Sequence, residues 1–434
     1  MKKNGFTLVE ITVCVVLLVT IFLLVVPKVN TMINNKKKNA YNSLISTVKD
    51  AAQAYVYLNV NIVDDAIESQ GYYEVSIRTL QENELLENKL ENPLTGKNIP
   101  STSIVKIIKN NEEYIYKFSL DYQYLLEHII DLYSNEETRI SNGLKKDNTE
   151  DKNIRYYGSD PNNYVRFNNE LWRIIGVFGN NVKLVRSETL GKLSWDSSES
   201  SVNDGYGINQ WGESKDTSGN IYEGADLKVY LNKMYYGGTS VTCYNGYNNT
   251  TTTCPTNTLD ETAKSSIDNH TWNTGAIQYK TRTDTLAFYS AERGTIGKMC
   301  SSGSYCNDTV TRKTTWTGYV ALPYVTDWAY ASSESVCETN MQKQDSSNNY
   351  NYICKNNNWM HYGSTYNDVT WYLSPFTNPS NANFVWRVNG DGFVRYDFAT
   401  YPLSVFPTIY LKSNILIESG KGTSSDPYIL KAGS

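Results

Sequence analysis

Thiol groups are the most reactive side chains in this chain, and six of them lie in its C-terminal part. They are Cys243, Cys254, Cys300, Cys306, Cys337 and Cys354, whereas the seventh, Cys14, stands near the N-terminus. An even number of cysteines in an exported domain favours disulfides, and pairing between neighbours would close three short polar loops. Structural zinc is one alternative, but no C-x-x-C motif occurs and the chain has only 3 histidines; free thiols are another. We therefore predict disulfides between neighbouring cysteines, and no metal or cofactor.

Tryptophan rings and one turn carboxylate are the candidates for ligand binding. Trp328, Trp371 and Trp386 could stack on sugars, although aromatic side chains more often belong to a core. Asp391 lies in an Asn-Gly-Asp-Gly segment, which is typical of a tight turn between strands. Calcium binding there would need further carboxylates. If these residues bind a ligand, the expected partner is a host or surface glycan.

Catalytic patterns are weak in this sequence. Glu292 and Asp327 could form the acid pair of a glycoside hydrolase. No Ser/His/Asp or Cys/His order stands out, and there is no glycine-rich phosphate loop. We therefore do not expect an enzyme, and keep catalysis by the C-terminal part as an alternative. The net charge of −5 and the lack of a basic tract after Lys38 argue against nucleic-acid binding.

One acid interrupts an apolar segment at the N-terminus. A short basic leader ends in Gly5, and Phe6 begins a run of 21 residues to Val26 that contains only four polar ones, Thr7, Glu10, Thr12 and Thr20. Such a run is long enough to cross a bilayer as a helix. Because no small-residue cleavage site follows it, a removable secretory signal is not favoured. A carboxylate inside a membrane costs about 2.5 kcal/mol or more, so Glu10 should have a cationic partner.

The Lys-Asn-Gly-Phe-Thr-Leu-Val-Glu stretch resembles the leader of type IV pilins and of type II secretion pseudopilins. The resemblance implies that a prepilin peptidase cuts between Gly5 and Phe6 and methylates Phe6. It also implies that Glu10 pairs with the N-terminus of a neighbouring subunit during assembly. An ordinary signal anchor is the alternative. The expected partners are the peptidase, other pilin subunits, the pilus assembly machinery and the membrane.

These residues imply a particular location. We expect a single-pass protein of the cell membrane with a cytoplasmic N-terminus before processing, and then an extracellular pilus or cell-surface protein. Lysines after the apolar run, Lys28 and residues 36–38, would by themselves favour the opposite orientation. The leader motif and the cysteines favour the orientation with a cytoplasmic N-terminus and an extracellular C-terminal part.

The elements that must position the N-terminal motif follow from apolar periodicity. Apolar or small residues recur at Ile33, Ala40, Leu44, Val48, Ala51, Tyr55 and Leu58, which is one helical face. We predict a transmembrane and spine helix over 6–58 and a pilin-like head over 59–135, with a hairpin of strands 102–108 and 114–120. A helix is expected over 122–133. The charged segment 136–153 is predicted to be a linker.

Residues 154–434 are expected to form a second, β-rich domain. Strands are predicted on both sides of an Asn-Asn-Glu turn at 168–170 and over 182–187, with a helix over 225–232. The Trp-x-Leu-Ser-Pro segment at 371–375, the hairpin at 388–392 and the strand at 407–412 resemble a surface-protein domain of low-GC Gram-positive bacteria. The C-terminal part also resembles, more distantly, C-type lectins and formylglycine-generating enzymes. A formylglycine-type activity would need a copper site built on cysteines, for which no matching motif occurs.

The predicted fold class is therefore α+β: a transmembrane helical spine, a small pilin-like head and a larger disulfide-containing domain. The predicted function is that of a minor or tip subunit of a type IV pilin-like filament, which displays the large domain for adhesion. The tip position rests on the size of that domain, which would crowd a filament if every subunit carried it. A pseudopilin of a secretion system, a competence pilus subunit and an enzyme on a pilin stalk are the alternatives.

Overall fold

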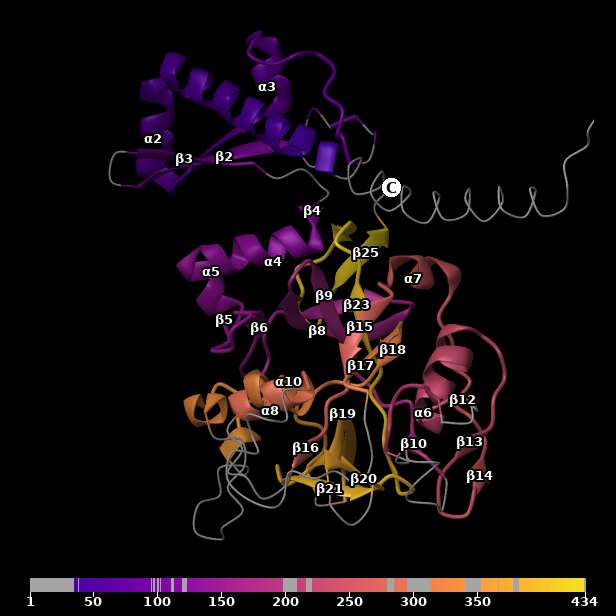
Figure 1. Ribbon diagram of the computed structural model, residues 1–434. Coiled ribbons are helices and arrows are strands. Elements are labelled where there is room, and N and C mark those ends of the chain that lie inside the picture. The colour runs from indigo at the N-terminus through magenta and orange to yellow at the C-terminus, as the bar shows by residue number, and fades with distance from the viewer. Residues whose placement is uncertain are drawn as a thin grey trace, which may run out of the picture. The chain divides into compact units, whose positions relative to one another are not determined.

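The chain is a mixed α+β protein that divides into two compact units, Met1–Gln123 with Gly433–Ser434 and Tyr124–Ala432. The computed structural model describes residues 35–432, except 38, 95, 97, 100, 102, 111–112, 119–122, 198–208, 216–220, 279–284, 295–312, 340–352, 366 and 378–381. Figure 1 shows the helices and strands of both units. Each unit has its own apolar core, so each is described by itself.

The expected transmembrane architecture needs correction. Among the residues that the structure describes, no helix is both long and apolar enough to cross a bilayer. The segment 6–26, on which the span was predicted, lies outside the described residues, as does Cys14. The fold class with a transmembrane spine and the single-pass membrane localisation are therefore withdrawn, and the mixed α+β architecture stands in their place.

Unit 1 is a helical segment packed on a three-stranded antiparallel sheet. Residues 39–58 are helical, Asn59 interrupts the helix, and α2 continues over Val60–Gln70 to the left-handed Gly71. The sheet has the order β1-β2-β3, formed by Tyr73–Ser76, Ile104–Asn110 and Glu113–Lys117. A short helix, α3 over Ile77–Glu82, begins at Ser76, whose hydroxyl caps Thr79 N at 3.0 Å. The predicted hairpin of strands 102–108 and 114–120 is thus present as β2 and β3.

The core of unit 1 is apolar. The helical residues Val48, Ala52 and Val56 are buried, and the strands bring Val105 and Ile107 against them. The predicted helical face is only partly right, because Leu58 is 65% exposed. One polar cluster ties the helix to the hairpin, since Asp64 accepts hydrogen bonds from Lys109 Nζ and Tyr114 Oη at 3.1 and 2.7 Å.

Unit 2 contains a large sheet in the order β18-β23-β9-β8-β7-β25-β24-β4, with β6 paired to β8 and β5 to β6. In chain order its strands are β4 (Gln123–Tyr124), β5 (Leu144–Lys146), β6 (Ile154–Tyr156), β7 (Tyr164–Phe167), β8 (Glu170–Phe178), β9 (Asn181–Arg186), β18 (Val320–Ala321), β23 (Thr408–Leu411), β24 (Ile415–Ser419) and β25 (Tyr428–Ala432). The predicted Asn-Asn turn joins β7 to β8, and both asparagines have positive φ, as a two-residue hairpin turn requires. Gly176 lets β6 approach β8, because a Cβ there would lie 2.1 Å from Ile154 O.

A second sheet has the order β10-β22-β19-β20-β21, and β16 pairs in parallel with β19. Its strands are β10 (Lys192–Ser194), β16 (Ile277–Gln278), β19 (Val369–Thr377), β20 (Phe384–Asn389), β21 (Val394–Phe398) and β22 (Pro402–Ser404). Three small two-stranded sheets pair β11 (Ser214–Lys215) with β12 (Ile221–Tyr222), β13 (Cys243–Tyr244) with β14 (Thr251–Thr252), and β15 (His270–Asn273) with β17 (Thr315–Gly318).

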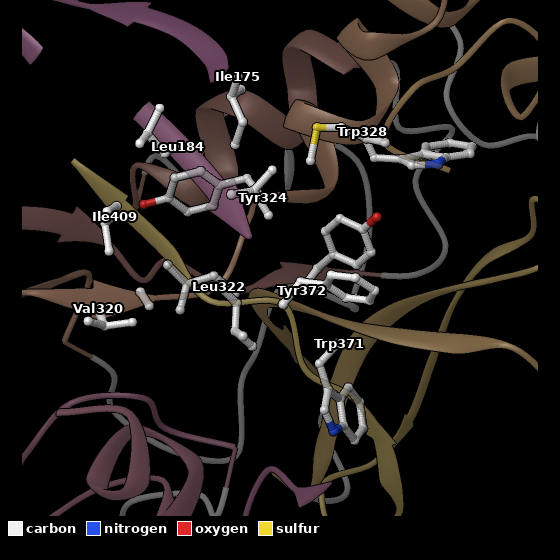
Figure 2. Packing of buried hydrophobic residues seen from close by; sticks show 14 of the residues in the cluster. Ile175, Leu184, Val320, Leu322, Tyr324, Trp328, Trp371, Tyr372 and Ile409 are labelled. Carbon is white, nitrogen blue, oxygen red and sulfur yellow. The ribbon is translucent and has the colours of Figure 1, made fainter. Parts of the chain in front are cut away.

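The helices of unit 2 are short and connect these sheets. They are α4 (Leu125–Ser134), α5 (Glu136–Ser141), α6 (Asp226–Val229), which runs on as a π-helix over Tyr230–Tyr236, α7 (Glu261–Ser266), α8 (Thr285–Glu292), α10 (Val325–Ala331) and a 3-10 turn over Ser335–Glu338. Figure 2 shows part of the shared core, in which Ile175 and Leu184 from the large sheet lie near Tyr324 and Leu322. One continuous core therefore holds the two sheets and α10 together.

The predicted linker over 136–153 is wrong. Residues 136–141 form α5 and residues 144–146 form β5, which pairs with β6. Asp147 and Asn153 are buried, with exposed fractions of 2% and 5%. The division between the units lies instead at Gln123 and Tyr124. Asp147, Thr149 and Asn153 of this segment are buried in hydrogen bonds, whereas Glu136, Glu137 and residues 150–152 are exposed.

Candidate functional site

The predicted processing and assembly residues Gly5, Phe6 and Glu10 lie outside the described residues. The described part of the chain begins with the helical residues 35–37 and 39–58. Around the junction of this helix with α2, large apolar side chains are left in solvent, of which the most exposed are Tyr57 at 83%, Leu58 at 65% and Ile62 at 59%. We call these three residues the exposed apolar cluster. Large side chains of this kind grouped within six residues are typical of a surface that another protein covers.

The tryptophans proposed for sugar stacking are core residues. Trp328, Trp371 and Trp386 each have an exposed fraction of 0%, and Figure 2 shows Trp328 and Trp371 among the packed side chains. The indole nitrogens of Trp371 and Trp386 donate to the carbonyl oxygens of Leu193 and Ile277 at 3.1 and 3.0 Å. Their interpretation as ligand-binding residues is therefore corrected, because no face of these rings reaches solvent.

Asp391 belongs to a tight turn. The turn joins β20 to β21, Gly392 has a φ of 88°, and Gly392 N donates to Asn389 O at 2.8 Å. The Asp391 carboxylate accepts from Phe393 N at 3.3 Å. Among the described residues, no three His, Cys, Asp or Glu side chains are placed to hold a metal ion. The turn geometry accounts for this aspartate without a ligand.

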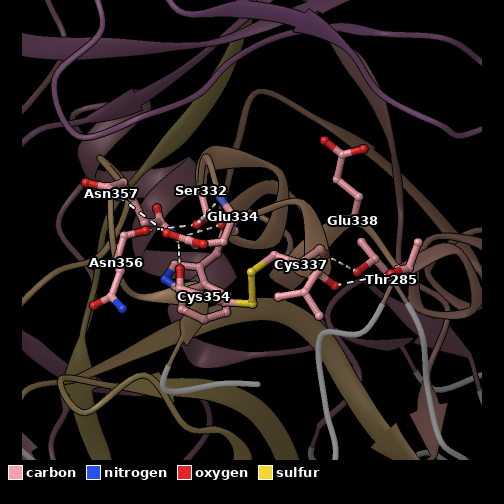
Figure 3. Close-up of a disulfide and its surroundings, with 12 residues drawn as sticks. Thr285, Ser332, Glu334, Cys337, Glu338, Cys354, Asn356 and Asn357 are labelled. Atoms are coloured by element: carbon pink, nitrogen blue, oxygen red, sulfur yellow. Dashed lines mark hydrogen bonds between the residues drawn. A yellow bond between two sulfur atoms is a disulfide. The ribbon is translucent and has the colours of Figure 1, made fainter. Parts of the chain in front are cut away.

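Two of the three expected cysteine pairs form disulfides. Cys243 is bonded to Cys254, and Cys337 to Cys354, with Cα–Cα distances of 5.2 and 5.6 Å. Cys300 and Cys306 lie outside the described residues. Figure 3 shows the second disulfide beside Thr285, whose hydroxyl donates to Cys337 O at 2.5 Å. This bridge therefore links the 3-10 turn over Ser335–Glu338 to the segment that follows residue 352. It lies beside Thr285, the first residue of α8.

A buried charge cluster in unit 2 is the most unusual chemical feature of the described chain. Asp327, on the first turn of α10, accepts a hydrogen bond from Arg155 of β6 at 2.8 Å and from Lys183 of β9 at 2.5 Å. The backbone N–H of Tyr324 donates to the same carboxylate at 2.9 Å and so caps the helix. All three charged side chains are at most 1% exposed. We call Arg155, Lys183 and Asp327 the buried triad.

A second carboxylate balances the charge of the buried triad. Asp147 accepts from Arg155 Nε at 2.7 Å, from Thr149 Oγ1 at 2.6 Å and from Asn153 Nδ2 at 3.0 Å. Burial alone would lower the pKa of Arg155, but the adjacent carboxylates raise it above its usual range. Burial likewise opposes ionisation of Asp327, yet Lys183 and Arg155 hold the pKa of this carboxyl below its usual value. The guanidinium and both aspartates are therefore charged at neutral pH.

The pKa values of Lys183 and Glu292 are shifted toward neutral pH. Burial lowers the pKa of Lys183 to about 8, partly offset by Asp327. Burial raises the pKa of Glu292 to about 7, and the Thr326 hydroxyl donates to this carboxyl at 2.7 Å. Such shifted values in one place are frequent at functional sites, although structural ion-pair networks produce them too. The suggested acid pair Glu292 and Asp327 is thus brought together, but both carboxyls are closed off from solvent.

Sequence reasoning missed Arg155, Lys183 and Asp147. A usable signal was present, because Lys183 stands in a strand in which every residue after Asn181 is buried. A charged residue in a continuous buried strand must have a partner. The partner could not be found from sequence, since Asp327 lies 144 positions further along the chain.

The chain was also compared with known proteins. The comparisons with protein-family models, with curated proteins and with solved structures found no match. The functional conclusion therefore rests on the sequence and the geometry described above.

Proposed function

We propose that this chain is a type IV pilin-like filament subunit, in which unit 1 takes part in assembly and unit 2 is displayed. The observation that carries the proposal is the succession of two features. A Gly5-Phe6 motif with Glu10 comes first, and a helix packed on a small antiparallel sheet follows it. This order is that of a pilin, in which an N-terminal helix leads into an α/β head.

The exposed apolar cluster supports an assembly role for unit 1. Tyr57, Leu58 and Ile62 are large, apolar and solvent-exposed, although the other face of the same helical segment is buried on the sheet. Leaving such side chains in water is unfavourable by roughly 1.5–3 kcal/mol each relative to full burial. A neighbouring subunit that covers them would recover part of that free energy.

The disulfides support display of unit 2 in an oxidising environment. Disulfides persist outside the reducing cytosol, and both bridges close short loops of 11 and 17 residues. Because the three predicted tryptophans are buried, a surface ligand would have to be bound by other residues of unit 2. The proposed adhesive role therefore rests on the display of unit 2. None of those three tryptophans contributes to it.

The proposal is tested by processing and assembly of the full chain. Co-expression with a prepilin peptidase should yield a mature protein that begins with methylated Phe6, as read by N-terminal mass spectrometry. Glu10→Ala should abolish recovery of the chain in sheared filaments, whereas Thr12→Ala, a polar residue in the same run, should leave it unchanged. An uncut N-terminus, or equal filament recovery for both variants, would contradict the proposal.

A further inference from the structure

The contact between Lys183 and Asp327 differs from the other lysine–carboxylate pairs of the described chain. Its Nζ and Oδ2 atoms lie 2.5 Å apart, and both side chains have an exposed fraction of 0%. In the other lysine pairs of the described residues the carboxylate side chain is at least 28% exposed. An amine and a carboxyl are therefore held in contact where solvent cannot separate them.

Aromatic rings enclose this contact. The Lys183 ammonium lies 4.1 Å from the ring centroid of Tyr324 and 5.3 Å from those of Phe178 and Tyr410, with Trp272 at 5.6 Å. Burial in this low-dielectric environment lowers the pKa of Lys183 to about 8, whereas its two cationic neighbours keep the Asp327 carboxyl ionised in the resting state. The neutral amine, which is the nucleophilic form, is thereby within reach at ordinary pH.

The two oxygens of Asp327 have different partners. Oδ1 accepts from the Arg155 guanidinium at 2.8 Å, whereas Oδ2 accepts from Lys183 at 2.5 Å and from the backbone N–H of Tyr324 at 2.9 Å. A fixed cation at Oδ1 would stabilise negative charge that develops there when a nucleophile adds to the carboxyl carbon. One of the two donors at Oδ2 is the attacking group itself. The arrangement separates the oxygen that would be retained from the oxygen that would leave.

We propose that Lys183 and Asp327 condense spontaneously to an intramolecular amide that links β9 to α10. A proton first passes from Lys183 Nζ to Asp327 Oδ2, and the neutral amine then attacks Cγ. The C–N bond forms, and the negative charge on Oδ1 faces Arg155. Oδ2 takes a second proton from the nitrogen and leaves as water, with Oδ1 as the amide oxygen. The ammonium and carboxylate together lose one water, so the step needs no oxidant and no co-reactant.

The fixed proximity of Lys183 and Asp327 would accelerate their condensation. Intermolecular condensation of an amine and a carboxylic acid in water is slow, but groups held in a productive geometry react with effective molarities of about 10⁵ M or more. Both partners stand on regular elements, Lys183 on β9 and Asp327 on the capped first turn of α10. The link would close a loop between residues 144 positions apart. This inference does not depend on the proposed filament role.

The test is a peptide map of the full chain, made after reduction and alkylation so that no disulfide joins peptides. The intact mass is expected to be lower by the mass of one water than the mass of the same chain without the link. Trypsin is expected not to cleave after Lys183, and the peptide that contains it is expected to be joined to the peptide that contains Asp327. Full mass with normal cleavage after Lys183 would overturn the proposal.

Variants test whether the link joins Lys183 and Asp327. Lys183→Arg keeps the cation but should restore the full mass and the separate peptides. Lys228→Arg, at another lysine paired with a carboxylate, should leave the link in place. Asp327→Asn should give the same linked product with loss of ammonia instead of water. If Lys183→Arg does not fold, the map of the wild-type chain still decides, because cleavage after Lys183 is read directly.

Discussion

The two units of this chain are stabilised by different means. Unit 1 has a mainly aliphatic core that also contains Tyr55 and Phe118, and its Lys109–Asp64 ion pair is partly exposed. Unit 2 contains all 9 tryptophans, both described disulfides and the buried triad. Unit 2 therefore combines an extensive apolar core with covalent links and a buried ion-pair network. The difference fits one unit that is packed into an assembly and another that stays exposed.

Loss of the disulfides should give the largest difference between the units. Replacing Cys243, Cys254, Cys337 and Cys354 by serine removes two loop closures, each worth roughly 2–4 kcal/mol. We expect the free energy of unfolding of unit 2 to fall and that of unit 1 to stay constant. Native-state hydrogen exchange, read on peptides from each unit, measures both. Equal loss of protection in the two units would show that they unfold together.

The pH dependence of Glu292 should give an intermediate effect confined to unit 2. Its folded pKa of about 7 lies above the usual 4.5, so its stabilising contribution is complete below pH 4.5 and is lost as the pH rises through 7. Between pH 4.5 and pH 8, unit 2 should lose up to about 3 kcal/mol relative to Glu292→Gln. The comparison with this variant is necessary because burial lowers the pKa of His128 to about 4, which acts in the opposite direction.

Denaturant titrations at several pH values, followed by tryptophan fluorescence, measure the Glu292 effect. Every tryptophan lies in unit 2, so this signal reports that unit alone. The difference between the wild-type chain and Glu292→Gln should grow with pH over this window. A difference that does not change with pH would mean that Glu292 is already ionised in the folded protein.

Helix caps should give the smallest effect, and they form a matched pair. Ser76 caps α3 in unit 1 by accepting from Thr79 N at 3.0 Å, and Asp260 caps α7 in unit 2 by accepting from Ala263 N at 2.7 Å. Replacement of either by alanine should cost about 1 kcal/mol. Hydrogen exchange should place each loss in the unit that carries the substitution. A loss that spreads to the other unit would contradict two independent cores.

Local patterns were predicted well and distant partners were not. The hairpin of β2 and β3 and the Asn168–Asn169 turn follow from strand alternation and turn residues, which act over a few positions. Trp328, Trp371 and Trp386 were predicted to be available for sugar stacking because the sequence does not show which sheet covers each ring. The linker was misread because a polar segment looks flexible until Arg155 is known to need Asp147. Pairings such as Lys183 with Asp327 depend on topology, which no local pattern encodes.

The place of β25 has a consequence for biosynthesis. This strand, Tyr428–Ala432, lies between β7 and β24, and it pairs in parallel with β7, more than 260 positions earlier in the chain. The large sheet is therefore incomplete while the ribosome is still making residue 427, and β7, which already pairs with β8, must wait with its other edge open. Unpaired edges of this kind invite association with other chains. A chaperone that shields nascent strand edges would be needed most during synthesis of this unit, and premature termination before residue 428 would leave an aggregation-prone product.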